Sequence, residues 1–590
     1  MTGRAVATTA GLIAVVWVTC GGCRRDEPTG PGAADHSPST AATKTVPVFT
    51  DVTEQAGLDF YHFIGATGRY YFPEIMGSGC ALFDYDNDGD LDLYAVQGAM
   101  LEPGKTIEEA TFAFRGSGQP RNRLFRNDLE AGALHFTDVT EAAGVGHGGY
   151  GMGCTVGDYD NDGFTDLYVT NVGANVLYHN NGDGTFSDVT AAAKVDDPRW
   201  STSAAFADLN GDGLLDLYVV NYVDWRLEID RACYSATGAR DYCSPLTYKP
   251  ASDSLFIQRS KGRFENVTAA AGIDRDRGNG LGVVCADFNG DGRMDIYVAN
   301  DGGANFLWIN GGDGTFKDQA LLSGAAVNDD GMPEAGMGVT AQDFDGDGDA
   351  DLFLTHLKGE TNTLYVNDGG GIFHDATIEF ALATDSRPVT GFGVRWFDYD
   401  NDGLLDLFSA NGAVYYLDAQ AGDAYPYKQP NQLFHQTDGG RFENVSARSG
   451  PVFSVSEVSR GAAFGDLDND GDVDVAVLNQ NGGPLRLLRN EVGSRQHWLT
   501  LQLVGRTSNR SAIGARVALT LPGGRTLWRR VSADGSYCSA NDLRVHFGLG
   551  ETNEVAELVV HWPGGRKEKW PSPTVDTQVR LVEGEGRPLP

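Results

Sequence analysis

The sequence predicts an all-β protein, a seven-bladed β-propeller followed by a small C-terminal β-sandwich. Three observations predict this fold. An acidic nonapeptide recurs seven times, two further short motifs travel with it, and the residues after 494 alternate between apolar and polar positions. The 78 glycines in 590 residues also favour tight turns and short strands over helices.

The net charge of −36 narrows the range of partners. Such an acidic chain is a poor match for nucleic acid or for an anionic membrane surface. Acidic chains can be disordered, but a hydrophobic content of 41% and an aromatic content of 10% indicate a folded protein. We therefore expect no nucleic-acid partner.

Residues 1–23 are predicted to be a signal peptide, because Arg4 precedes an apolar run from Ala5 to Thr19. Cys23 follows two glycines, as at a bacterial lipoprotein cleavage site, and is the predicted lipidation site. Cys20 stands where an aliphatic residue is usual, so cleavage elsewhere and free secretion is the alternative. The predicted location is extracellular, periplasmic or, through a lipid anchor, at the cell envelope.

The acidic nonapeptide has the form D-x-[DN]-x-D-G-x-x-D, and we call each copy an acidic corner. An F-x-[DN] element and a leucine-led strand that ends near Asn accompany it, and Asn-Gly and Asp-Gly pairs between them predict hairpins. The corners begin at Asp84, Asp158, Asp208, Asp287, Asp343, Asp398 and Asp466.

The order of the motifs at the two ends of the array predicts a ring. The first F-x-[DN] element, at Phe49, has no leucine strand before it, and the last leucine strand, at Leu487, has no such element after it. Seven complete sets exist only if the first element completes the last blade, which removes exposed sheet edges. We expect a disordered tether over 24–47, the propeller over 48–490 and the β-sandwich over 494–585.

The corners are predicted to bind up to seven Ca²⁺ ions. Side chains at positions 1, 3, 5 and 9 supply hard oxygen ligands, glycine at position 6 allows the sharp turn, and the loops contain no His or Cys. The alternative is that Asp, Asn and Gly merely form good turns with solvated charge. The predicted ligands are Asp84, Asp86, Asp88 and Asp92 with the carbonyl of Asp90; Asp158, Asp160, Asp162 and Asp166; Asp208, Asn210, Asp212 and Asp216; Asp287, Asn289, Asp291 and Asp295; Asp343, Asp345, Asp347 and Asp351; Asp398, Asp400, Asp402 and Asp406; and Asp466, Asp468, Asp470 and Asp474.

These motifs resemble the FG-GAP/VCBS repeats of integrin-α-type propellers. The stretch from His497, with DGSYCSANDLRVHFGLG and VAELVVHWPGGR, resembles the ASPIC/UnbV domain of the cartilage acidic protein family. Cys538 departs from the S-Y-L-S pattern that is common there. The resemblance implies an extracellular, calcium-binding propeller with an accessory domain, and it implies no particular biochemical activity.

Two cysteines are predicted to form a disulfide. Cys233 and Cys243 lie ten residues apart in an insertion of a chain that we expect to be exported. The alternative is a pair of free thiols. Cys80, Cys154 and Cys285 precede acidic corners and are expected to be small buried residues.

The sequence shows no catalytic constellation, so the predicted function is a non-enzymatic binding or adhesion module for a protein or polysaccharide. The alternatives are an enzyme with its active site in the axial funnel and a scaffold for an extracellular assembly. The inserts Gln97–Arg121 and Tyr222–Pro250 are the favoured contact regions. Residues that either line an axial pocket or only cap the funnel are Glu74, His147, Trp200, Asn279, Glu334 and Arg460.

Overall fold

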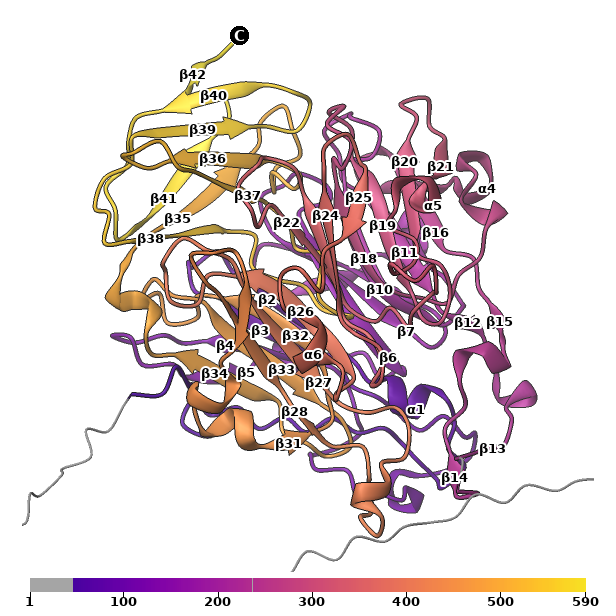
Figure 1. Ribbon diagram of the computed structural model, residues 1–590. Helices are drawn as coiled ribbons and strands as arrows, with labels where there is room; N and C mark the ends of the chain where they lie inside the picture. The colour runs from indigo at the N-terminus through magenta and orange to yellow at the C-terminus, as the bar shows by residue number, and fades with distance from the viewer. Residues whose placement is uncertain (1–45, 236) are drawn as a thin grey trace, which may run out of the picture. The chain divides into compact units, whose positions relative to one another are not determined.

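The computed structural model describes residues 46–235 and 237–590, and Val46–Pro590 form one compact unit (Figure 1). The predicted signal peptide, Cys23 and most of the tether lie outside the described residues. The described part contains seven four-stranded sheets. From inner to outer strand they are β2 (Cys80–Phe83), β3 (Asp92–Ala95), β4 (Arg123–Asn127) and β5 (Phe136–Asp138); β6 (Gly151–Gly157), β7 (Asp166–Asn171), β8 (Val176–Asn180) and β9 (Phe186–Asp188); β10 (Ser201–Ala207), β11 (Asp216–Asn221), β16 (Ser254–Ser260) and β17 (Arg263–Asn266); β18 (Gly280–Ala286), β19 (Asp295–Asn300), β20 (Phe306–Asn310) and β21 (Phe316–Asp318); β22 (Val339–Gln342), β23 (Asp351–Leu354), β24 (Thr363–Asn367) and β25 (Phe373–Asp375); β26 (Gly391–Phe397), β27 (Asp406–Asn411), β29 (Gln432–Gln436) and β30 (Phe442–Asn444); and β32 (Ser459–Gly465), β33 (Asp474–Asn479), β34 (Arg486–Asn490) and β1 (Phe49–Asp51).

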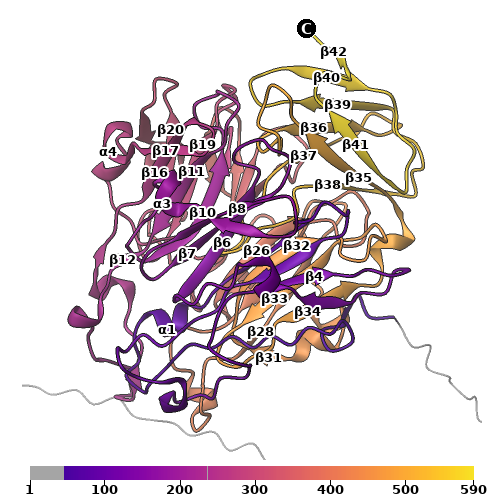
Figure 2. The ribbon, with the colours of Figure 1, turned by 180° about the vertical axis from the view of Figure 1, so that it is seen from behind.

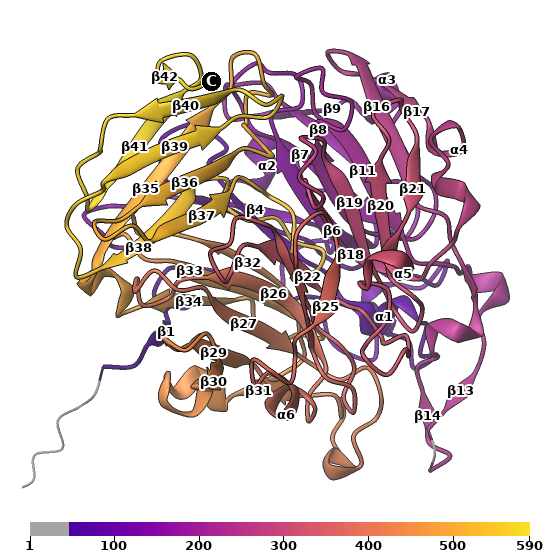
Figure 3. The same cartoon turned by 45° about the horizontal axis from the view of Figure 1, so that its top comes forward.

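The sheets close into a ring. Each inner strand contacts the next in the order β2, β6, β10, β18, β22, β26 and β32, and β32 contacts β2 again. The strand β1 pairs antiparallel with β34, with Phe49 opposite Asn490 (Figure 3). The expectation that the first F-x-[DN] element completes the last blade is therefore confirmed, and β1 covers the edge that β34 would otherwise expose.

Each blade lies between two others, which explains why its inner strands are apolar on both faces. Leu93 and Tyr94 on β3 point to opposite faces of their sheet, and both are fully buried. Leu93 packs in a cluster with Ala463 and Ala476 of the last blade. Tyr94 packs in another cluster with Cys154 and other residues of the second blade. The core is thus a circle of layers between neighbouring sheets.

The C-terminal residues form two further sheets (Figure 2). Alternate residues such as Leu499 and Leu501 point into a shared core, as the period-2 pattern predicted. One sheet has the order β38 (Val545–Gly550), β35 (His497–Val504) and β41 (Thr577–Val582). The other has the order β37 (Thr526–Arg530), β36 (Arg516–Thr520), β39 (Glu557–His561), β40 (Lys567–Trp570) and β42 (Arg587–Pro588).

A loop between β37 and β38 enters the centre of the ring, and we call Val531–Asn541 the plug. Every plug residue is buried. The plug hydrogen-bonds to the inner strand of all seven blades. The bonded residues on these strands are Cys80, Cys154, Ser203, Cys285, Val339, Val394 and Phe464.

The ring has two functionally different faces. An acidic corner joins the first and second strands of each blade, whereas the inserts follow the second strand, so corners and inserts lie at opposite ends of that strand. The C-terminal sheets lie on the corner face: Arg510 N–H donates to Asn161 Oδ1 at 2.7 Å, and Arg544 Nη2 donates to the Asp466 carbonyl at 3.0 Å. The inserts are left on the other face.

Candidate metal centres and axial site

The first acidic corner is shaped by its own carboxylates. Asp84 accepts hydrogen bonds from the N–H groups of Asp88 and Gly89, each at 3.1 Å. Asp92, which is fully buried, accepts from Tyr85 N–H at 3.0 Å through Oδ2. Asp86 Oδ1 is buried and has no hydrogen-bond partner in the described structure. One carboxylate oxygen in the corner thus lacks a partner that a cation would supply.

The fourth position of each corner is restricted to Asn or Gly, a preference that the D-x-[DN]-x-D-G-x-x-D motif does not include. Asn87 has φ of 61° and Gly89, at the sixth position, has φ of 98°. Asn and Gly tolerate this left-handed region best, so two such residues are needed for the turn. The fourth position is Asn or Gly in every corner, and its φ is positive at Asn87, Asn161, Gly211, Gly290, Gly346, Asn401 and Asn469.

The carboxylates converge closely enough to hold a metal ion. Single oxygens of Asp84, Asp86 and Asp92 lie within 4.8 Å of one another, as do those of two further all-aspartate sets. Oxygens that bind one Ca²⁺ at about 2.4 Å lie at most about 4.8 Å apart. The other two sets are Asp158, Asp160 and Asp166, and Asp343, Asp345 and Asp347.

Burial makes the closing aspartate of each corner dependent on a counter-charge. Burial, together with a smaller contribution from neighbouring carboxylates, raises the pKa of Asp92 to about 9 and that of Asp216 to about 8, although backbone N–H groups that donate to both carboxylates oppose the shift. Without a cation these carboxyls keep a proton at neutral pH. A bound divalent cation favours the charged form and reverses this preference.

Each corner is also tied to the preceding blade, through what we call the interblade latch. Asp92 Oδ1 accepts from Asn127 N–H at 2.8 Å, and Asn127 Nδ2 donates to the Leu467 carbonyl in the previous corner at 2.9 Å. The same side-chain bond to the preceding corner occurs in all seven blades. Its donors are Asn127, Asn180, Gln258, Asn310, Asn367, Gln436 and Asn490.

Two histidines border acidic corners, although the sequence analysis found none within the loops. His179 Nδ1 lies 3.3 Å from Asp166 Oδ1 and 3.6 Å from Asp160 Oδ2. His435 Nδ1 lies 3.1 Å from Asp406 Oδ1. Hydrogen bonding to Asp166 raises the pKa of His179 to about 9. Both residues come from the third strand of their blades, so a search confined to the nonapeptide could not find them.

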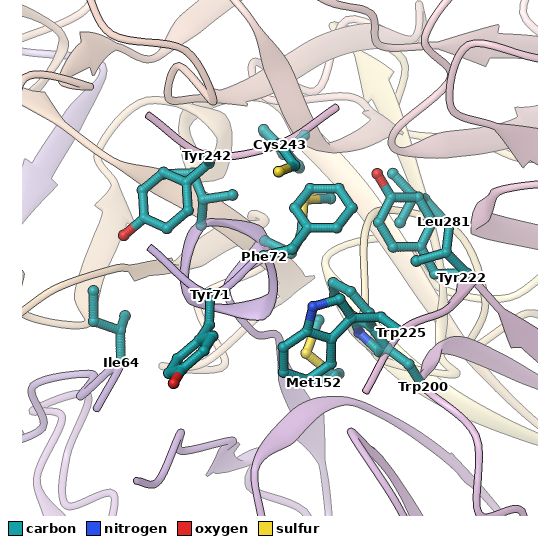
Figure 4. Close-up of a cluster of buried hydrophobic side chains, with 14 of the residues drawn as sticks. Ile64, Tyr71, Phe72, Met152, Trp200, Tyr222, Trp225, Tyr242, Cys243 and Leu281 are labelled. Atoms are coloured by element: carbon teal, nitrogen blue, oxygen red, sulfur yellow. The ribbon is translucent and has the colours of Figure 1, made fainter. Parts of the chain in front are cut away.

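The residues predicted for an axial pocket divide into three groups. Trp200 and Arg460 are buried near the axis on the insert face, where Trp200 packs edge-on against Phe72 with centroids 5.3 Å apart (Figure 4). Glu74 is buried and borders a cavity. Asn279 is buried, and its Nδ2 donates to the Asp301 carbonyl. His147 and Glu334 are half-buried, and neither they nor Asn279 border that cavity. The six residues predicted for the axial pocket are Glu74, His147, Trp200, Asn279, Glu334 and Arg460.

The described cysteines fall into a bonded pair and four buried thiols. Cys233 and Cys243, the predicted pair, are joined by a disulfide with Cα atoms 5.1 Å apart. Cys80, Cys154 and Cys285 are buried, as expected, and Cys538 in the plug is also buried. Burial raises the pKa of the Cys80 and Cys538 thiols to about 12, so these are packing residues rather than reactive thiolates.

Two protein families match this chain. The ASPIC and UnbV family matches residues 505–588, and the FG-GAP-like repeat matches residues 158–219, 237–298, 287–354 and 343–409. Cartilage acidic protein 1 of Xenopus tropicalis is 29% identical over 51% of this chain and 44% of its own length. The Homo sapiens protein of that name is 28% identical over 51% and 43%. The match thus spans less than half the length of these curated relatives.

A solved structure, the BP39L lectin from Burkholderia pseudomallei, aligns with 71% of this chain and 97% of its own at 13% identity and a TM-score of 0.40. The six described α-helices have four residues each, and no described helix has the length and apolar character needed to span a membrane.

Proposed function

We propose that this FG-GAP-repeat protein, which also carries an ASPIC and UnbV domain, is an exported binding or adhesion module whose propeller holds up to seven Ca²⁺ ions. Its partner is a protein or a polysaccharide. The chain reaches the extracellular, periplasmic or cell-envelope side of a membrane, with Cys23 as the site of a lipid anchor. The role that we propose for the protein is non-enzymatic.

The main support for the calcium proposal is that one aspartate belongs both to an acidic corner and to the interblade latch. The closing aspartate both faces the converging carboxylates and holds the N–H of the latch residue. A cation that keeps Asp92 ionised therefore strengthens the bond to Asn127, because charged acceptors form stronger hydrogen bonds. Asn127 in turn holds Leu467 of the previous blade. Calcium is thus expected to stabilise the closure of the ring.

The arrangement of the axis supports binding over catalysis. The plug occupies the centre of the ring, and its Tyr537 belongs to the same buried cluster as the aromatic residues of the insert side. These residues include Trp200, Tyr222 and Trp225, which pack together (Figure 4). Inserts on a rigid ring are well suited to recognise a partner. The insert with the Cys233–Cys243 disulfide contributes to this face.

Thermal unfolding with and without a chelator tests the calcium proposal. We expect EGTA to lower the melting temperature, and Ca²⁺ but not Mg²⁺ to restore it. At free Ca²⁺ about 100-fold above Kd, each independent site adds about 2.7 kcal/mol to the free energy of unfolding. Elemental analysis should find up to seven calcium ions per chain. An unchanged melting curve in EGTA, with no metal bound, would refute the assignment.

Glycan arrays and pull-downs with the calcium-loaded protein test the binding role. We expect a partner that is retained in Ca²⁺ and lost in EGTA, because the inserts depend on the ring for their positions. Absence of any retained glycan or protein in both assays contradicts the binding function and leaves the calcium assignment intact.

A further inference from the structure

The insert face contains a cavity of about 120 Å³ that the sequence analysis did not identify. Four separate segments border it: the stretch around Glu74, the first insert at Phe112, the disulfide-bonded insert at Tyr242, and the connection between β27 and β29 at Tyr425. The lining includes six aromatic residues and two carboxylates, and no Lys, Arg or His. The aromatic and acidic lining residues are Tyr70, Phe112, Tyr242, Tyr416, Tyr425, Tyr427, Glu74 and Asp423.

Five of the aromatic rings form a continuous wall. The centroids of Tyr70 and Tyr242 lie 5.1 Å apart, and those of Tyr242 and Tyr427 lie 5.7 Å apart. Tyr427 contacts Tyr425 at 4.9 Å, and Tyr425 contacts Phe112 at 5.6 Å. Tyr70 and Phe112, at the two ends of the wall, are half-buried, whereas the three rings between them are buried, so the middle of the wall lies inside the protein.

Glu74 borders this cavity, and one of its carboxylate oxygens accepts no hydrogen bond from the described residues. Its side chain is fully buried, Oε2 accepts from Tyr242 O–H at 3.3 Å, and Oε1 has no partner among the described residues. Burial is the main reason that the pKa of Glu74 is raised to about 8, and hydrogen bonds from Tyr242 and the backbone of Tyr71 oppose this shift. A buried acceptor without a donor is costly, so a ligand that supplies positive charge or a donor there would gain affinity.

We propose that this cavity binds an organic ammonium group, with the aromatic wall around the cation and the carboxylate of Glu74 as its counter-charge. Aromatic faces attract cations, and rings arranged around a carboxylate are a suitable host for alkylated ammonium groups. Arg240 already lies over the outer ring of this wall, 5.5 Å from the Tyr70 centroid. The volume exceeds the roughly 30 Å³ of one water and approaches the about 150 Å³ of a cavity that holds benzene.

This inference rests on the proposed binding function, because it names the class of ligand that the protein binds. It does not depend on calcium at the corners. A neutral sugar is the competing ligand, because sugar hydroxyls also donate to carboxylates and pack on aromatic rings. The two ligands differ in charge. A comparison of a cation with a neutral compound of the same shape therefore distinguishes them.

Isothermal titration in Ca²⁺-containing buffer at about pH 9, above the pKa of about 8 of Glu74, tests the proposal with four probes. These are choline, its uncharged carbon isostere 3,3-dimethylbutan-1-ol, n-butylammonium and methyl glucoside. We expect both cations to bind and the neutral isostere to bind at least about tenfold more weakly than choline. Equal binding of choline and the isostere, binding of methyl glucoside alone, or no binding by any probe overturns the proposal.

Substitutions then locate the site. At about pH 9, where Glu74 is ionised, Glu74→Gln keeps the shape and removes the charge, so choline should bind at least about tenfold more weakly while the isostere is unaffected. Phe112→Ala, at the half-buried rim, should weaken both. Glu443→Gln, on the exposed face of β30, is the matched control and should change neither. If both cavity variants bind choline as tightly as the unaltered protein, the cavity is not the binding site. A change in melting temperature on adding a chelator tests only the calcium sites at the corners.

Discussion

Gly79 packs so tightly against Cys538 that a β-carbon on Gly79 would lie 1.8 Å from the Cys538 carbonyl oxygen. The two residues are 459 positions apart in the chain and meet where the plug passes the first inner strand. The neighbouring Cys154 N–H donates to the same carbonyl at 3.1 Å. The inner strands therefore need minimal side chains next to the plug, and the plug is an integral part of the ring.

We predict that Gly79→Ala destabilises the protein. The added methyl group meets main-chain atoms of Cys538 that cannot move without breaking the plug's hydrogen bonds, so we expect a loss of roughly 3 kcal/mol, near the upper end for overpacking. The measurement is urea unfolding in Ca²⁺. Gly439→Ala is the control, because a β-carbon there contacts nothing within 4 Å. Equal stability of the two variants contradicts a tightly fitted plug.

We predict that Asn490→Ala weakens the latch that closes the ring. Asn490 Nδ2 donates to the buried Tyr399 carbonyl at 2.7 Å, and its loss leaves that acceptor with one fewer partner, at a cost of about 1–3 kcal/mol. Thermal unfolding measures the effect. Asn181→Ala changes an exposed residue whose side chain bonds only to Thr185 and Ser187 of its own hairpin, and it should alter stability by no more than about 0.5 kcal/mol.

We predict that Asp160→Ala removes one calcium ion. The Oδ1 atom of Asp160 is buried without a partner and lies in a converging carboxylate set, so its loss should abolish binding at that corner. Elemental analysis should find one Ca²⁺ fewer per chain than in the unaltered protein. Asp59→Ala is the exposed control, for which the calcium content should not change. Identical calcium content in the Asp160 variant contradicts the ligand assignment.

We predict that Glu74→Gln changes the pH dependence of stability. The folded pKa of Glu74, about 8, lies above its ordinary value of 4.5, so the folded protein retains a proton that the unfolded chain releases. Stability from this group is present below about pH 4.5 and is lost as the pH rises through 8. Relative to the unaltered protein, the variant should thus gain roughly 3–5 kcal/mol between pH 5 and pH 8.5. A gain that is independent of pH contradicts the burial of an ionisable Glu74.

The sequence predicted the blades well because their signal is local and repeated. Each corner places its turn residues and carboxylates within nine positions, and the unpaired element at Phe49 and strand at Leu487 indicated the closure. It did not reveal the plug, since DGSYCSAND reads as an ordinary turn. What distinguishes Ser536 and Cys538 is contact with strands hundreds of residues earlier.

The cavity escaped prediction for a similar reason. Phe112, Tyr242 and Tyr425 lie in three different connections, and each looks like a scattered aromatic residue until the ring brings them together. Glu74 was among the residues considered for the axis, but its burial and its unsatisfied oxygen depend on neighbours from all these segments. The histidines at the corners were missed because they come from the next hairpin.

The plug determines when the native ring can form during synthesis. The last blade needs a strand from near the beginning of the chain, and the centre of the ring is completed only by Val531–Asn541, close to its end. A ribosome must therefore translate the message beyond Asn541 before the final arrangement is available. Until then the nascent polypeptide has apolar blade surfaces and an empty axis, so chaperones that delay collapse should increase its folding yield.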